Sequence, residues 1–111
     1  MEMKSEQVGS NMILRLSGRF DSYETGRVGE WLDQASGQPP ARVILNLSEV
    51  NFVDSSALAL MVKGMKRCRQ QQGDLYLCNL QQPVRVIFEL TRLDKAFSMY
   101  GTEEEALRAF G

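Results

Sequence analysis

Histidine is absent from this sequence, and cysteine occurs only twice, at Cys68 and Cys78. The absence of histidine removes the commonest general base and the commonest zinc ligand. Two cysteines alone cannot supply the four ligands of a structural zinc site. Hydrolytic and metal-dependent chemistry are therefore disfavoured, and we expect a protein that is not an enzyme and needs no cofactor.

An excess of charge of one sign is also missing. Thirteen basic residues are balanced by 14 acidic residues, and the formal net charge is −1. Phosphate backbones and anionic membranes attract proteins with a basic excess, so direct binding to nucleic acid is disfavoured.

Long apolar runs are missing as well. No segment approaches the roughly 20 apolar residues of a membrane-spanning helix, so we expect no membrane insertion. Residues 1–11 include Glu2, Lys4 and Glu6 and lack the apolar stretch of a secretory signal. We therefore expect a cytoplasmic protein whose two cysteines are reduced and buried, with a structural disulfide as the alternative.

What the sequence does contain is an ordinary globular mixture, with 43% apolar and 24% charged residues. Its length fits one domain, which we expect to span residues 1–111. Strand and helix patterns alternate in the order β, β, α, β, α, β, α, β, α. That order predicts an α/β fold with a single-layer, mainly parallel sheet, an antiparallel N-terminal edge strand and about four covering helices.

The expected strands are marked by apolar alternation or by continuous apolar runs. They are Met3–Val8, Met12–Ser17, Arg42–Leu47, Leu75–Cys78 and Phe97–Tyr100. We expect Gly18 to end the second strand, and Glu49 and Asn51 to lie in a loop after the third. Helices are expected after the N-cap candidates Asp21 and Ser22, from Ala57, at Pro83 and after Thr102.

The segment Asp54-Ser55-Ser56 follows a buried strand and lies at or just before the first residue of a helix. In α/β folds, partners and ligands meet the loops at the carboxyl ends of the strands. The simpler interpretation is that these residues only cap the helix, because Asp and Ser are preferred N-cap residues. Two hydroxyl groups and a carboxylate nevertheless exceed what one cap requires.

This position would also tolerate phosphate. A phosphoserine adds roughly −1.5 to −2 charges, and a helix N-terminus accepts anions through its free N–H groups. Phosphorylation would leave the fold intact and place a dianion on an exposed surface, where like charge or desolvation can eject a protein partner.

Residues 46–60, NLSEVNFVDSSALAL, closely resemble the phosphorylation-site region of the anti-sigma factor antagonist, or STAS, family. The resemblance extends over nearly the whole chain. It includes residues 16–21 (LSGRFD), which look like the family's L-x-G-x-x-D segment, residues 73–78 and residues 83–93.

The resemblance implies partner switching. It makes Ser55 the residue that an anti-sigma factor serine kinase phosphorylates and a serine phosphatase restores. Asp54 and Ser56 would be its neighbours in the docking surface, and Asp21 would help to contact the kinase. Unphosphorylated protein would sequester the anti-sigma factor and so release a sigma factor. The sequence departs from the family pattern at Ala57, where glycine is usual. Alanine costs little at a helix start and should leave Ser55 usable, but it could tighten the approach of this loop to a partner.

Two other functions remain as alternatives. STAS-like domains also serve as accessory subunits of lipid or anion transport assemblies. An enzyme that uses Ser55 with Asp54 is disfavoured, because the sequence has no histidine, nucleophile elbow or glycine-rich phosphate loop.

A basic strip beside the serine could contribute to docking or be only a solvated helix face. It consists of Lys63, Lys66, Arg67 and Arg69.

Overall fold

The computed structural model describes residues 1–111 and contains one five-stranded sheet in the order β1-β2-β3-β4-β5. Its strands are β1 (Glu2–Val8), β2 (Asn11–Phe20), β3 (Arg42–Val53), β4 (Asp74–Cys78) and β5 (Met99–Tyr100). β1 and β2 are antiparallel, and every later neighbouring pair is parallel. The helices are α1 (Thr25–Ala35), α2 (Ser55–Gln70), α3 (Gln82–Leu90) and α4 (Glu103–Phe110), with a short 3₁₀ helix η1 at Leu93–Lys95. The fold class expected from the sequence is confirmed.

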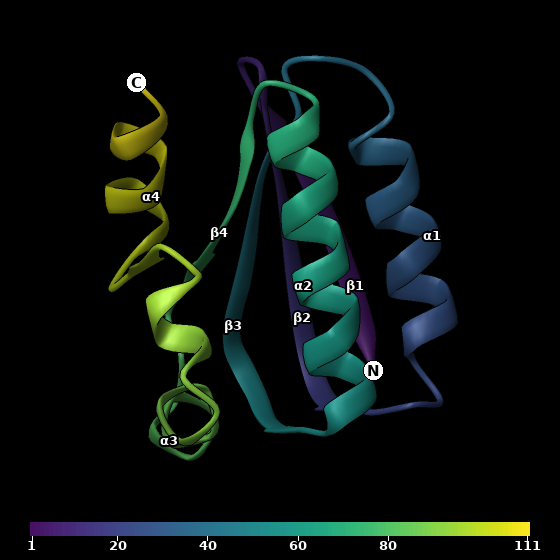
Figure 1. The fold of residues 1–111 in the computed structure, drawn as a ribbon, viewed down its shortest axis with the longest axis vertical. Helices are drawn as coiled ribbons and strands as arrows, with labels where there is room; N and C mark the ends of the chain where they lie inside the picture. The colour runs from purple at the N-terminus through teal and green to yellow at the C-terminus, as the bar shows by residue number, and fades with distance from the viewer.

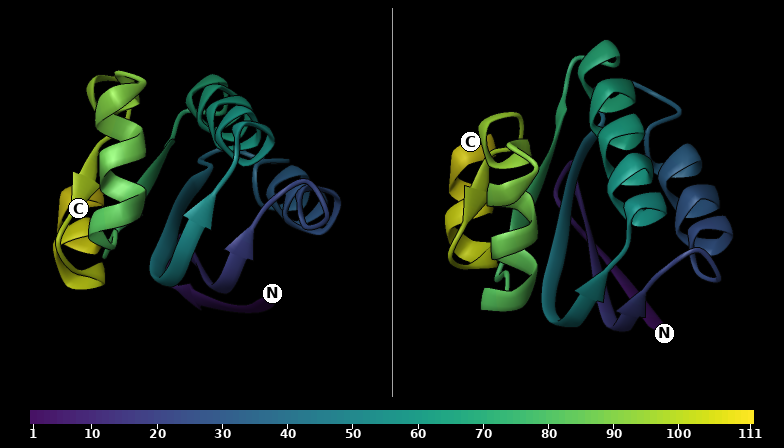
Figure 2. Two further views of the ribbon diagram at one scale, coloured as in Figure 1. Left: turned by 90° about the horizontal axis from the view of Figure 1, so that it is seen from below. Right: turned by 60° about the horizontal axis from the view of Figure 1, so that its bottom comes forward.

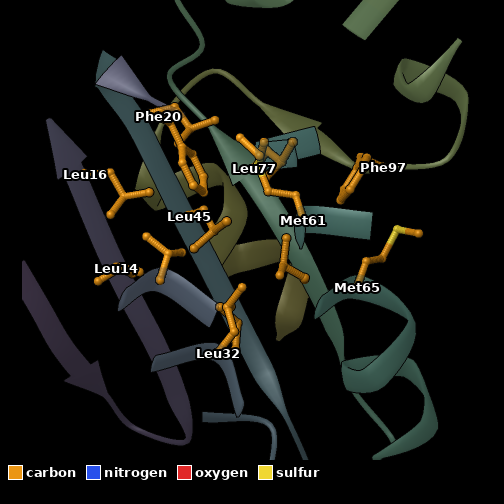
Figure 3. Packing of buried hydrophobic residues seen from close by; sticks show 14 of the residues in the cluster. Leu14, Leu16, Phe20, Leu32, Leu45, Met61, Met65, Leu77 and Phe97 are labelled. Atoms are coloured by element: carbon orange, nitrogen blue, oxygen red, sulfur yellow. The ribbon is translucent and has the colours of Figure 1, made fainter. Parts of the chain in front are cut away.

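Three helices cover one face of the sheet, and α4 covers the part of the other face formed by β3, β4 and β5 (Figures 1 and 2). Alternate residues of the strands point to opposite faces, and α1, α2 and α3 pack on the face that presents Leu14, Leu45 and Leu77 (Figure 3). Ile44 and Cys78 point the other way, into a smaller cluster beneath α4. The cysteines are buried and free, as expected. No helix combines the length and the apolar character needed to cross a membrane.

β2 and β3 are longer than the sequence suggested. Gly18 does not end β2, which continues to Phe20, and residues 48–53 belong to β3 and not to a loop. Parallel pairing persists through two register shifts, and Val50 and Val53 are buried on the core side. The shifts leave Ser48 and Glu49 exposed in succession, so the segment lacks the strict alternation by which a strand is recognised.

The start of α1 also differs from expectation. Asp21 and Ser22 are not its N-cap, because the helix begins at Thr25 with Glu24 at the cap position. Asp21 instead organises a turn, in which its carboxylate accepts the Tyr23 N–H and its carbonyl oxygen accepts the Glu24 N–H. By contrast, Thr102 does cap α4, and its hydroxyl oxygen accepts the Glu105 N–H at 3.1 Å.

Candidate functional site

The candidate site lies where β2 and β3 end side by side, next to the start of α2 (Figure 2). Phe20 pairs with Val53 at the last rung, so Asp21 and Asp54 leave the sheet from neighbouring positions. The Asp54 N–H donates to the Phe20 carbonyl oxygen at 3.2 Å. The parallel pairing of β2 with β3 therefore brings together two segments that are 33 positions apart in the sequence.

Asp54 is the N-cap of α2 and the centre of the site. Its Oδ1 accepts the Ser56 hydroxyl at 2.7 Å and the Ala57 N–H at 2.9 Å, and its Oδ2 accepts the Ser22 N–H at 3.0 Å. These hydrogen bonds, above all that from the Ser56 hydroxyl, hold the pKa of the Asp54 carboxyl below its usual value. Asp54 thus fixes the helix start and also ties it to the turn after β2.

The two adjacent serines differ in their environments. Ser55 is the first residue of α2, its side chain is exposed, and no hydrogen bond within the protein engages its hydroxyl group. The Ser56 hydroxyl is partly buried and donates to Asp54. Of the two hydroxyl groups, that of Ser55 is therefore the more accessible from solvent.

Asp21 lies in the adjacent turn, and its side chain is 22% exposed. One oxygen accepts the Tyr23 N–H at 3.1 Å, and the other lies 3.9 Å from Nε of Arg19. The turn is joined to α2 through the backbone of Ser22. The structure thus brings the segments of all four candidate residues, Asp21, Asp54, Ser55 and Ser56, to the same end of the sheet.

The sequence analysis missed two features of the surroundings. Tyr23 is 90% exposed in the turn beside Asp21, and the Arg19 guanidinium lies 3.9 Å from the centre of the Phe52 ring. Exposed tyrosine and arginine side chains are favoured where proteins bind one another. Arg19 and Phe52 are partners in the β2–β3 register, so this contact could not be seen while residues 48–53 were assigned to a loop.

The site is an exposed polar surface and not a cleft. None of the hollows on the molecule is lined by Asp21, Asp54, Ser55 or Ser56. Asp54 is held in place by three donors, and its carboxylate makes no contact with the Ser55 hydroxyl that would activate it as a nucleophile. Such an exposed polar surface at the end of the sheet is suited to contact with another protein.

The comparison with known families agrees. The family model of the STAS domain matches residues 2–106, and the chain belongs to this family. STAS proteins of the anti-sigma factor antagonist type are binding proteins and not enzymes.

Similar proteins share the fold over almost their full lengths. The chain is 27% identical over 108 residues to the anti-sigma F factor antagonist of Paenibacillus polymyxa, which covers 96% of this chain and 92% of that protein. A solved anti-sigma-factor antagonist (STAS) domain protein from Planctomyces limnophilus is 25% identical, with a TM-score of 0.88 over 97% of each chain. The Bacillus cell fate determinant SpoIIAA in its phosphorylated form is also 25% identical, with a TM-score of 0.75 over 97% of this chain and 98% of that one.

Proposed function

We propose that this protein is an anti-sigma factor antagonist whose binding is controlled by phosphorylation of Ser55. In its unphosphorylated form it binds an anti-sigma factor kinase, and so releases the sigma factor that the kinase had held. The kinase phosphorylates Ser55 and a serine phosphatase reverses the modification. The observation that carries the proposal is the free, exposed Ser55 hydroxyl at the start of α2.

The local structure explains why phosphate would act as a switch and not as a denaturant. Ser55 occupies the first helical position, where free N–H groups and the positive end of the helix dipole favour an anion. The adjacent Asp54 is held in its ionised form by its hydrogen bonds. A dianion added beside this carboxylate concentrates negative charge on the docking surface. A partner whose surface is complementary to the neutral serine then binds less tightly.

Asp54 and Asp21 have different roles in this proposal. Asp54 positions Ser55 by capping α2 and is largely occupied with its three donors. The second oxygen of Asp21 accepts no hydrogen bond within the protein, and its nearest charged partner is the exposed Arg19 guanidinium at 3.9 Å. We therefore assign Asp21 to direct contact with the kinase, together with the exposed ring of Tyr23.

The test is incubation with ATP and the purified anti-sigma factor kinase encoded in the same genome. We expect one phosphate per chain on the wild type, none on Ser55→Ala, and retained labelling of the matched Ser56→Ala control. After phosphorylation, the affinity for the kinase should fall by about tenfold or more, which corresponds to about 1.4 kcal/mol.

Three results would count against the proposal: no labelling of the wild type, equal labelling of Ser55→Ala, or phosphate on Ser56. Copurification with the subunits of a membrane transport ATPase, in place of a soluble kinase, would favour the role of an accessory subunit in lipid or anion transport.

A further inference from the structure

The outer face of α2 forms one side of an open groove that has no assigned role. The groove has a volume of about 590 Å³, and Leu93 of η1 lines its other side. Its apolar residues are Leu58, Ala59, Val62 and Leu93, and its rim includes the cations Lys63 and Lys66. We call this surface the α2 groove.

The charged residues of the α2 groove are all basic. α2 contains four basic residues and no acidic residue, although the whole chain has a net charge of −1. Arg67 and Arg69 are already paired, with Asp33 at 2.6 Å and with Asp74 at 3.0 Å. Lys63 and Lys66 are exposed and have no acidic partner in the structure. The four cations are therefore not one continuous strip, and only the two lysines are free to pair with an incoming ligand.

The face of α2 that lines the groove also carries the candidate phosphorylation site. Residues spaced by three or four positions share one face of a helix, and Ser55, Ala59, Val62 and Lys66 follow that spacing. From Ser55 to Lys66 this stripe is about 17 Å long, at about 1.5 Å per residue. A single partner segment can therefore contact the serine at one end and the lysines at the other.

We propose that the α2 groove docks an acidic amphipathic helix of the anti-sigma factor, an inference that rests on the proposed function. A groove that runs beside a helix and is lined by apolar residues suits the apolar stripe of a partner helix. The free lysines select carboxylates along the edge of that helix. A second copy of this chain fits poorly, because a two-fold contact through this face would place Lys63 and Lys66 of both copies together.

This arrangement also explains why the unphosphorylated form would bind the partner and the phosphorylated form would release it. The acidic helix is attracted by the lysines while Ser55 is unmodified. Phosphate on Ser55 places a dianion at the other end of the same stripe, where it repels the carboxylates of the partner helix that lie closest to it. The two lysines and Ser55 thus act on one partner segment with opposite signs.

The experiment compares the double variant Lys63→Glu/Lys66→Glu with Lys4→Glu/Arg108→Glu. Lys4 lies in β1 and Arg108 in α4, both residues are exposed, and neither forms an ion pair. Every reversal removes two units of charge, so both double variants change the net charge from −1 to −5. Affinity for the purified anti-sigma factor kinase is measured by calorimetry, and circular dichroism verifies that each variant is folded.

We expect the reversal in the groove to weaken binding by about tenfold or more at low salt, with an effect that shrinks as salt screens the charges. The control pair should remain within about threefold of the wild type. Ala59→Arg tests the apolar base of the groove. It should also weaken binding although it adds a cation, because it blocks the floor on which the partner helix packs.

Equal binding by the groove variant and the control would overturn the inference. So would a dimer of the wild type that the groove reversal dissociates, or binding of anionic phospholipid vesicles that depends on the two lysines while kinase binding does not. Labelling of Ser55 by the same kinase separates the two proposals. If Ser55 is labelled and the groove variant binds normally, only the docking inference fails; if the wild type is neither labelled nor bound, both fail.

Discussion

At the scale of single residues, Asp54 links the stability of α2 to pH. Its folded-state pKa is lowered by hydrogen bonds from Ser56, Ala57 and Ser22, so its charge stabilises the protein at pH values above the unfolded-state pKa of about 3.9. This contribution is lost as the pH falls through the lowered folded-state pKa. Asp54→Asn retains a good N-cap residue but loses the charge and the second acceptor oxygen.

We therefore expect Asp54→Asn to have a lower urea midpoint than the wild type at neutral pH, and the difference to shrink below about pH 4. Urea unfolding followed by circular dichroism between neutral and acidic pH measures this. Ser55→Ala is the control and should show no such pH-dependent difference. A difference that stays constant down to about pH 3 would mean that the carboxylate charge does not contribute.

The sequence was sufficient to select Asp54, Ser55 and Ser56 because an Asp-Ser-Ser triplet at a strand-to-helix junction is a local pattern. The pattern alone does not separate the two serines, and the choice of Ser55 came from the resemblance to the STAS family. Their difference depends on the Ser56 hydroxyl pointing to Asp54, which is a matter of side-chain geometry. The link from Asp54 to the Ser22 N–H spans 32 positions and follows only from strand pairing.

At the scale of secondary structure, the carboxylate of Glu103 ties the first turn of α4 to two strands of the sheet. Glu103 accepts two hydrogen bonds from Arg15 of β2, at 2.7 and 2.9 Å, and one from Asn46 of β3 at 2.6 Å. These partners lower the pKa of the Glu103 carboxyl, Arg15 most of all. At the other end of α4, the Phe110 ring stacks on Tyr76 with ring centres 3.9 Å apart.

Glu103→Gln should lower the free energy of unfolding by about 1–2 kcal/mol, because it removes a charge-assisted pair that is only partly exposed to solvent. The neighbouring Glu104 is exposed and forms no ion pair, so Glu104→Gln is a matched control with an expected change within about 0.5 kcal/mol. Urea titration of both variants measures the difference. Equal stability of the two variants would show that the hydrogen bonds of Glu103 to Arg15 and Asn46 do not contribute to the free energy of unfolding.

The elements themselves were predictable in number, type and order, but several of their boundaries were not. Residues 48–53 look like a loop because Ser48, Glu49 and Asn51 are polar. They remain extended because β2 continues beside them through its register shifts. Similarly, Asp21 has the composition of an N-cap but is used in the turn before Glu24. Local patterns specify what an element is, whereas its ends depend on neighbours distant in sequence.

At the scale of the whole molecule, the proposed partner-binding residues lie on one side of the sheet and α4 lies on the other. Ser55 and the α2 groove belong to the face covered by α1, α2 and α3, whereas α4 covers part of the opposite face. Both faces share the same central strands, since Leu45 points to one side and its neighbour Ile44 to the other. Because neither cluster can be exposed without disturbing the shared strands, we expect the molecule to unfold as one unit.

The two cysteines report on this cooperativity because each lies in a different cluster. Cys68 of α2 belongs to the larger cluster and Cys78 of β4 to the smaller one. Burial raises the pKa of the Cys68 thiol to about 11 and that of the Cys78 thiol to about 12, so neither is reactive in the folded protein. In the unfolded chain both thiols return to a pKa of about 8.5 and react readily.

With a thiol reagent at about pH 8 and increasing urea, Cys68 and Cys78 should become reactive over the same range, and this range should coincide with the loss of helical circular dichroism. Mass spectrometry of the labelled peptides distinguishes the two sites, and the single variants Cys68→Ala and Cys78→Ala confirm the assignment. Labelling of Cys78 at urea concentrations that leave Cys68 protected would show that α4 opens first. The hydrogen bonds of Glu103 to both β2 and β3 argue against such separate opening, since releasing α4 also leaves the partly buried Asn46 amide without its acceptor.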